Sequence, residues 1–175
     1  LKESFAHYNE SYNFENSGEA REPTIDMGKI ELDLDLRNVV IKFIEYSKKR
    51  NLNKEIDPLM PKGSTALFSG PSGTGKTVTA EAIANALGMP FKKVTPSDFL
   101  SKYVGETEGK IKEIFKEAQK EKYVLFIDEA EGLFSAREGA KNSWEKTQVD
   151  ELLRQLEDFR GILIVATNHS VMIDS

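Results

Sequence analysis

The chain contains no cysteine among its 175 residues and only two histidines. The absence of cysteine excludes disulfides, thiolate metal sites and thiol catalysis. The two histidines, His7 and His169, stand far apart and are too few for a His-based metal site. No apolar run approaches the length of a membrane-spanning helix, and the N-terminus lacks the layout of a signal peptide. We therefore expect a cytoplasmic protein that makes no use of a membrane.

Basic residues are outnumbered, because 24 Lys and Arg stand against 29 Asp and Glu, and the formal net charge is −5. This balance argues against a dominant non-specific nucleic-acid-binding role, although it leaves room for a small basic pocket for phosphate. Hydrophobic residues make up 39% and charged residues 30%, as in soluble globular proteins. The length fits one ordinary domain with a proper hydrophobic core.

The N-terminal part differs in character from the rest. Residues 1–28 are polar and aperiodic, so we expect a flexible arm or linker there, followed by a folded domain over residues 29–175. Apolar residues recur at helical spacing over residues 36–49. The basic residues Lys48, Lys49 and Arg50 then suit the C-terminus of this helix. A phosphate-binding patch is the alternative, and an acidic protein favours the helix end.

Beyond residue 63, short apolar runs alternate with amphipathic stretches. We expect strands over residues 65–69, 91–95, 123–127 and 162–166, and helices over residues 77–87, 108–120 and 144–159. The first of these strands is a candidate for burial in the core. Such alternation predicts an α/β fold in which helices cover both faces of a parallel sheet. The β-branched run over residues 162–166 is typical of a parallel strand buried on both sides.

The segment GPSGTGKT, residues 70–77, matches the phosphate-loop pattern GxxxxGK[ST] and lies between an expected strand and an expected helix. Its glycines permit a wrapped backbone whose N–H groups point inward at phosphates, aided by the positive end of the following helix. Lys76 would reach the outer phosphates, and the hydroxyl of Thr77 would ligate Mg²⁺. The expected nucleotide-binding residues are Gly70, Pro71, Ser72, Gly73, Thr74, Gly75, Lys76, Thr77 and Val78. A chance glycine-rich turn is the alternative, which this context disfavours.

Polar side chains follow two of the expected strands. Asp128 and Glu129 come directly after the third strand, and ligands of open α/β sheets bind beyond such strand ends. Asp128 would hold Mg²⁺, and Glu129 would orient and deprotonate an attacking water, which points to hydrolysis. Asn168 follows the fourth strand and would sense the γ-phosphate or the attacking water. Taken separately, the carboxylates could form a solvated acidic turn and Asn168 an ordinary turn; beside a phosphate loop, the functional interpretation is favoured.

These segments together resemble the AAA family of ATPases, within the wider AAA+ group. GPSGTGKT is similar to its Walker A motif, VLFIDEA to its Walker B motif, and IVATN to its sensor-1 strand. The segment SKYVGETE, residues 101–108, is similar to the first pore loop of the branch that contains protein unfoldases and complex-disassembling ATPases. The resemblance covers residues 63–174, about two-thirds of the chain.

The resemblance implies a P-loop NTPase fold of the ASCE type, a three-layer sandwich, with ATP and Mg²⁺ as cofactors. It also implies a ring of identical subunits, usually a hexamer, that grips a polypeptide through the pore-loop residues Lys102, Tyr103, Val104 and Gly105. Nucleic acid is not an expected partner. Tyr103 offers a flat surface that packs on many side chains, and Gly105 lets the loop move. Packing of Tyr103 and Val104 in the core is the alternative.

The sequence departs from the family pattern at its C-terminal end. The chain stops at Ser175, before the family's arginine fingers, its last sheet strand and its helical lid domain. We therefore expect an incomplete large subdomain that binds ATP, and whose hydrolytic activity on its own is not assured. The rival functions are an ATP-gated assembly scaffold with little turnover, a small-molecule kinase and a DNA-loading motor. The Asp-Glu pair disfavours the scaffold, and the acidic charge disfavours the DNA motor.

Overall fold

The computed structural model describes residues 19–52, 62–99, 106–131 and 143–168. Its centre is a sheet of four strands in the order β1-β4-β3-β2, and all the strand pairs are parallel. The strands are β1 (Ser64–Ser69), β2 (Phe91–Val94), β3 (Val124–Ile127) and β4 (Ile162–Thr167). The helices are η1 (Met27–Lys29), α2 (Leu34–Leu52), α3 (Lys76–Leu87), α4 (Pro96–Phe99), α5 (Glu106–Glu121) and α7 (Ser143–Asp158). None of the described helices has both the length and the apolar character needed to cross a membrane.

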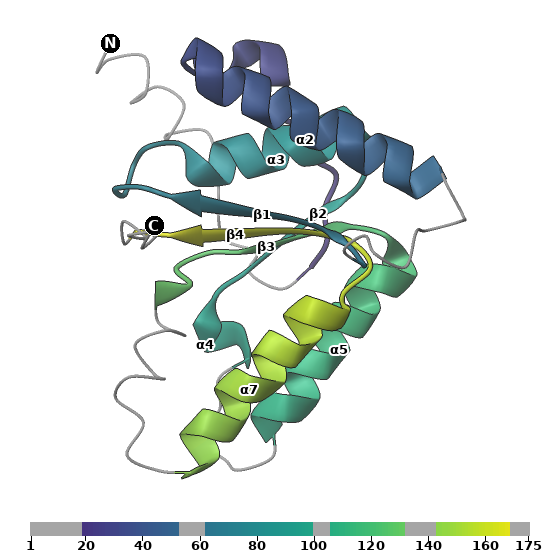
Figure 1. Cartoon of the computed structure of the whole chain (residues 1–175), viewed down its shortest axis with the longest axis vertical. Coiled ribbons are helices and arrows are strands. Elements are labelled where there is room, and N and C mark those ends of the chain that lie inside the picture. The colour runs from purple at the N-terminus through teal and green to yellow at the C-terminus, as the bar shows by residue number, and fades with distance from the viewer. Residues whose placement is uncertain (1–18, 53–61, 100–105, 132–142, 169–175) are drawn as a thin grey trace.

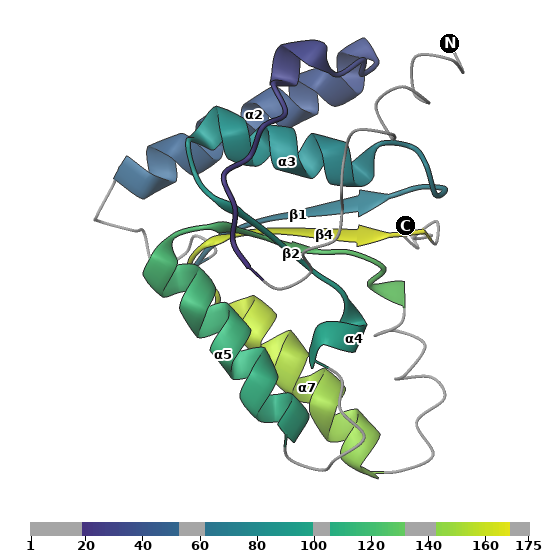
Figure 2. The same ribbon diagram turned by 180° about the vertical axis from the view of Figure 1, so that it is seen from behind.

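The molecule has three layers, with α2 and α3 on one face of the sheet and α5 and α7 on the other (Figure 1). The view from behind shows the same arrangement (Figure 2). Buried side chains fill the space on both faces, and aromatic pairs anchor each layer: Phe91 stacks on Phe126, and Phe115 meets Phe159 edge to face. Burial of each such side chain contributes about 1.5–3 kcal/mol. The prediction of a parallel sheet with helices on both faces is confirmed.

The strands differ in burial according to their place in the sheet. All residues of β3 are buried, and β4 is buried except for Val165, which is partly exposed; the β-branched run of β4 predicted a strand buried on both sides. β1 was expected to be a buried strand, but its residues alternate, and Leu67 is 53% exposed. The reason is its position, because β1 lies at one end of the strand order and pairs with β4 on one side. The sequence pattern of β1 therefore overstated its burial.

The strand order brings three loops together. β4 lies between β1 and β3, so the segments after Ser69, Ile127 and Thr167 leave the same edge of the sheet. Backbone hydrogen bonds join these segments to the end of β4: the Gly70 amide donates to the Thr167 carbonyl at 3.3 Å, and the Ala130 amide donates to the Ala166 carbonyl at 2.9 Å. The carboxyl ends of parallel strands are where ligands of α/β proteins bind.

Residues 21–30, here called the N-terminal strap, run along the edge of β2 and over α3. The Arg21 backbone pairs antiparallel with Phe91, and the Arg21 guanidinium donates to both carboxylate oxygens of Glu81 in α3. The Thr24 amide donates to the same carboxylate at 3.0 Å, and the Asn85 side chain donates to the Ile25 carbonyl at 2.7 Å. The sequence predicted a flexible arm up to residue 28, whereas the part of it from Arg21 onward is attached to α3 and β2 by these contacts.

Candidate functional site

The loop between β1 and α3 carries the predicted phosphate-binding residues. Its glycines Gly70, Gly73 and Gly75 all have positive φ, at 151°, 80° and 85°. These values are favourable for glycine and strained for other residues, which explains the glycine pattern. A Cβ added at Gly73 or Gly75 would meet no atom within 4 Å, so the positive φ, and not crowding, explains glycine at these two positions. Thr74 closes the loop on itself by donating its hydroxyl hydrogen to the Pro71 carbonyl at 2.9 Å.

The N-terminus of α3 directly follows this loop. Its N-cap is Gly75, which offers no side-chain acceptor to the first amides of the helix. These N–H groups and the helix dipole together make such an end suitable for an anion. Val78, the last residue of the predicted segment, lies in this first turn. The helix end therefore has the donors that phosphate oxygens need.

Lys76 points its ammonium group back across the loop. Its Nζ donates to the carbonyls of Gly70 and Pro71 at 2.7 and 2.9 Å, and to Oδ1 of Asn168 at 2.9 Å. The lysine of the loop after β1 therefore lies in contact with the polar residue after β4, as expected for neighbouring strand ends. All three acceptors are neutral oxygens, so a phosphate oxygen would be a stronger partner for this cation.

Asp128, half-buried after β3, lies beside α3. Its Oδ2 accepts from the Thr77 hydroxyl at 3.2 Å and forms an ion pair with Lys93 Nζ at 2.7 Å. Its Oδ1 accepts from the Glu129 amide at 3.0 Å. The structure therefore brings the two predicted metal ligands, Thr77 and Asp128, together. Lys93 was not singled out from the sequence, although two adjacent lysines in a buried strand are unusual enough to have drawn attention.

Glu129, the predicted base, is exposed, and its backbone has φ 56°, in the left-handed region. Strain of this kind in a residue with a Cβ costs on the order of 1 kcal/mol and often occurs at functional sites. The turn at Glu129 separates it from Asp128, so that the two adjacent carboxylates occupy different environments. The described side-chain contacts do not join Glu129 to Lys76, Thr77 or Asn168.

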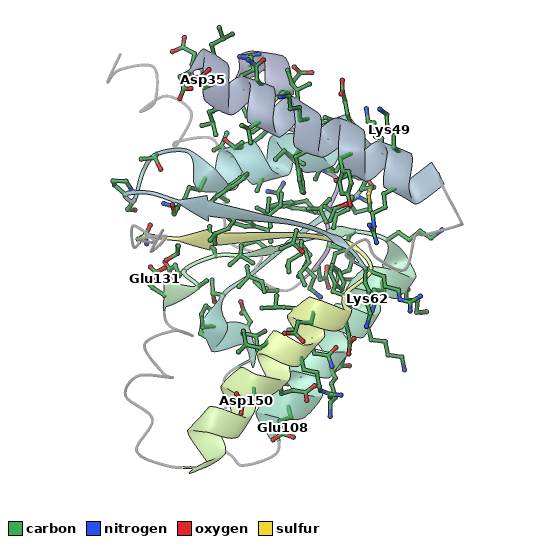
Figure 3. The ribbon with its side chains drawn as sticks, viewed as in Figure 1. Asp35, Lys49, Lys62, Glu108, Glu131 and Asp150 are labelled. Atoms are coloured by element: carbon green, nitrogen blue, oxygen red, sulfur yellow. The ribbon has the colours of Figure 1, made fainter. Side chains whose placement is uncertain are left out.

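Glu131 is a member of the site that the sequence analysis missed. Its carboxylate accepts from the Asn168 amide at 3.1 Å and from Asn168 Nδ2 at 2.8 Å. It lies at the edge of the sheet toward which the β1 and β4 arrows point (Figure 3). Because Glu131 engages the NH₂ group, the Oδ1 of Asn168 is left facing Lys76. The only signal in the sequence was a third carboxylate two residues beyond Glu129.

The hydrogen bonds at Glu131 also affect its ionisation. Partial burial alone would raise the pKa of the Glu131 carboxyl, but hydrogen bonds from its own backbone amide, from Asn168 and from Thr167 outweigh that effect and lower the pKa. Glu131 is therefore ionised at neutral pH, which is the state that accepts both hydrogen bonds from Asn168.

The donor set fits Mg²⁺ bound together with a phosphate. A hydroxyl and a carboxylate oxygen are hard ligands of the kind Mg²⁺ prefers, and Thr77 and Asp128 present them 3.2 Å apart. Within the described ranges, no three His, Cys, Asp or Glu side chains gather as a metal cage. Mg²⁺ typically binds through one or two protein groups, with waters and substrate phosphates completing its coordination. The open N-terminus of α3 beside these two groups is where such phosphates would lie.

The predicted pore-loop residues Lys102, Tyr103, Val104 and Gly105 lie outside the described residues. Their role therefore stays a prediction. The α4 helix, which was not expected from the sequence, ends at Phe99, shortly before these residues. At its start, the backbone amide and the hydroxyl of Thr95 both donate to Oδ2 of Asp98.

Comparisons with known proteins agree with this geometry. A family model described as "ATPase family associated with various cellular activities (AAA)" matches residues 66–175. Protein SAV of Sulfolobus acidocaldarius is 42% identical over 124 residues, which is 68% of this chain and 15% of that protein. The ATP-dependent zinc metalloprotease FtsH of Lachnoclostridium phytofermentans is 32% identical over 161 residues, 87% of this chain and 28% of that protein. This chain thus spans less than a third of either relative.

A solved structure resembles the fold. The crystal structure of the FIGL-1 AAA domain in complex with ADP matches with a TM-score of 0.63 over 96% of this chain and 55% of that chain. The sequence identity is 24%, so this likeness supports the fold alone. It identifies the sheet and its covering helices as the α/β fold of P-loop NTPases. The family match reaches all three strand ends that meet at the site, and the chain therefore belongs to the AAA family of ATPases.

Proposed function

We propose that the chain binds ATP with Mg²⁺ and is the ATP-hydrolysing core of a ring-shaped motor that remodels or translocates proteins. One observation carries the nucleotide part: Lys76, Thr77, Asp128 and Asn168 come from three strand ends and meet at the uncapped N-terminus of α3. A triphosphate bound at this point would contact Lys76, and its metal ion would contact Thr77. Two similar proteins, an ATP-dependent FtsH protease and an ADP-bound FIGL-1 domain, support the same ligand class.

In binding, the amides of the loop and of the first α3 turn would donate to phosphate oxygens. Lys76 would exchange its contacts with the Gly70 and Pro71 carbonyls for the outer phosphates, gaining charged acceptors. Thr77 and Asp128 would hold Mg²⁺, which neutralises charge on the phosphates.

In hydrolysis, Glu129 would remove a proton from a water molecule as the water oxygen attacks the γ-phosphorus. The bond from the γ-phosphorus to its bridging oxygen breaks, and ADP and inorganic phosphate leave. Asn168 would orient the water or the γ-phosphate, and Glu131 would hold the Asn168 amide in place. A positioned general base of this kind contributes about 10²–10⁴-fold to the rate.

The mechanical part of the proposal concerns further copies of the chain and a polypeptide partner. It depends on the segment SKYVGETE, in which Lys102, Tyr103, Val104 and Gly105 would line the central pore of a hexameric ring. The name of the FtsH relative, a protease, supports protein as the substrate class. We also propose that the ring is cytoplasmic.

The binding proposal is tested by replacing Lys76 with alanine and measuring the affinity for a fluorescent ATP analogue with Mg²⁺. Loss of a charged partner for the phosphates should weaken binding about 10- to 100-fold. The matched control is Lys62→Ala, since Lys62 is an exposed lysine paired with Asp158 at the opposite end of the sheet (Figure 3). Equal affinity in the Lys76→Ala variant and the control would contradict the nucleotide assignment.

The hydrolysis proposal is tested by Glu129→Gln in the longest form of the protein that can be purified, with phosphate release and ATP binding both measured. We expect ATP to bind as before and phosphate release to fall by about 10²-fold or more. Phosphate release that is equally low in both proteins, together with an ATP-dependent change in oligomeric state, would instead identify an assembly scaffold. Unchanged rapid release in the variant would show that Glu129 is not the base.

A further inference from the structure

Lys93 connects the edge strand of the sheet to the predicted metal ligand. It lies on β2, and Asp128 follows β3, two positions beyond the residue paired with Lys93. The ammonium group reaches Asp128 Oδ2 at 2.7 Å, and the two side chains are 31% and 14% exposed. The same oxygen accepts from the Thr77 hydroxyl, while Oδ1 accepts from the Glu129 amide. Both oxygens of this carboxylate therefore have donors within the protein.

The neighbouring lysine shows that this contact is specific to one face of the sheet. Side chains alternate along a strand, so Lys92 and Lys93 point to opposite faces. Lys92 is 6% exposed and pairs with Glu117 of α5, over the ring of Tyr123. Lys93 instead lies on the α3 face, with the phosphate loop, and its partial exposure gives its flexible stem room to move.

A magnesium ion would compete with the Lys93 ammonium group for the carboxylate of Asp128. Both are cations that need the carboxylate oxygens, and two cations close together repel each other. We propose that Lys93 is a built-in counter-ion that holds Asp128 in the metal-free protein and competes with Mg²⁺ for it, so that Lys93 sets the Mg²⁺ concentration at which nucleotide binds tightly. This inference rests on the proposed function, because it concerns the metal that accompanies the nucleotide.

Removal of the Lys93 ammonium should change both the affinity for Mg²⁺ and the stability of the metal-free protein. Without a competitor, Asp128 takes up Mg²⁺ at lower concentration. Without its ion pair, the metal-free protein is less stable, and bound Mg²⁺–ADP removes that difference. A lysine that contacts the phosphates directly behaves differently, because its loss weakens nucleotide binding whether or not Mg²⁺ is present.

The experiment titrates free Mg²⁺ and measures the affinity of the purified protein for a fluorescent ADP analogue, for the wild type, Lys93→Met and Lys93→Arg. We expect the Mg²⁺ midpoint to fall about three- to fivefold in Lys93→Met, the range for a partly exposed ion pair, and to stay near the wild-type value in Lys93→Arg. The affinity in EDTA should stay within about twofold, because Lys93 contacts the carboxylate of Asp128, which would act on the nucleotide through the metal. Lys62→Met, which removes the same charge from a remote surface pair, should change neither quantity.

The melting temperature gives a readout independent of nucleotide affinity. In EDTA, Lys93→Met should melt below the wild type, and the same substitution should have a smaller effect in an Asp128→Asn background, where the ion pair is already absent. A wild type that binds no nucleotide would overturn the proposed function and this inference together. A wild type that binds nucleotide with Mg²⁺ dependence, but whose midpoint does not move in Lys93→Met, would overturn this inference alone. A tenfold loss of affinity in EDTA would overturn it in favour of direct phosphate contact.

Discussion

The attachment of the N-terminal strap to α3 can be tested by replacing Arg21 with methionine. Methionine keeps an aliphatic chain beside the Phe91 ring, above which the guanidinium lies at 5.7 Å, but removes the charge. The partner, Glu81, is 1% exposed, and it would keep only the Thr24 amide and a longer contact to the Thr24 hydroxyl. The variant therefore leaves a buried carboxylate without its cation.

The size of the effect follows from the two hydrogen bonds that are lost. The guanidinium donates at 3.0 and 2.6 Å to the two carboxylate oxygens. Breaking a fully buried ion pair costs about 3–5 kcal/mol. Arg21 is 39% exposed, so water can partly replace it, and we expect a loss of about 2–3 kcal/mol in the free energy of unfolding. For a domain of this size that corresponds to a decrease of roughly 5–10 °C in melting temperature.

Urea denaturation followed by far-UV circular dichroism measures the loss, and a second substitution tests its cause. Glu81→Gln removes the buried charge but keeps an oxygen for the Thr24 amide, so Arg21→Met with Glu81→Gln should be more stable than Arg21→Met alone. Arg154→Met is the control, because Arg154 also donates hydrogen bonds to both oxygens of a carboxylate, that of Glu151, but is exposed on α7. Equal stability of the Arg21→Met and Arg154→Met variants, or no recovery in the double variant, would refute the reasoning.

Two further predictions concern close packing and the site. Gly63→Ala should lower the free energy of unfolding by about 1–3 kcal/mol, because its Cβ would lie 2.4 and 2.8 Å from two backbone carbonyl oxygens. Gly109→Ala, with open space around it within α5, should raise the free energy of unfolding by about 0.5–1 kcal/mol. Thermal melts of both variants check this, and a Gly63→Ala variant as stable as the wild type would contradict it. Glu131→Ala should lower the rate of phosphate release about tenfold with little change in ADP affinity, because Asn168 loses both of its hydrogen bonds to the Glu131 carboxylate. A loss of ADP affinity as large as the loss of rate would show that Glu131 also supports nucleotide binding.

The regular elements could be predicted because their signals are local. The helix expected over residues 77–87 is α3, from Lys76 to Leu87, and the strand expected over residues 162–166 is β4. The helix expected over residues 36–49 runs from Leu34 to Leu52, with Lys49 and Arg50 in its last turn as predicted. In each case the spacing of apolar residues within one segment is enough to define the element. The phosphate loop was recognisable for the same reason, since all its residues are consecutive.

The contacts that the sequence did not reveal join residues far apart in the chain. Arg21 and Glu81 are 60 residues apart, and Glu131 and Asn168 are 37 apart. A sequence shows that a carboxylate exists, but its partner depends on the strand order and on which face of a strand each side chain occupies. Lys92 and Lys93 illustrate the difficulty, because the face of the sheet decides the partner of each lysine. Lys92 pairs with Glu117 on the α5 face, and Lys93 pairs with Asp128 on the α3 face.

The central position of β4 bears on how the chain folds as it is synthesised. Of the described strands, β1 leaves the ribosome first, and its hydrogen-bonding partner is β4, the last of them. β2 and β3 can pair earlier, but among the described strands β1 gains its neighbour only once β4 has emerged. Pairings between such distant segments form slowly and leave apolar strands open to aggregation meanwhile. The nascent chain should therefore depend on chaperones during the interval between the synthesis of β1 and that of β4.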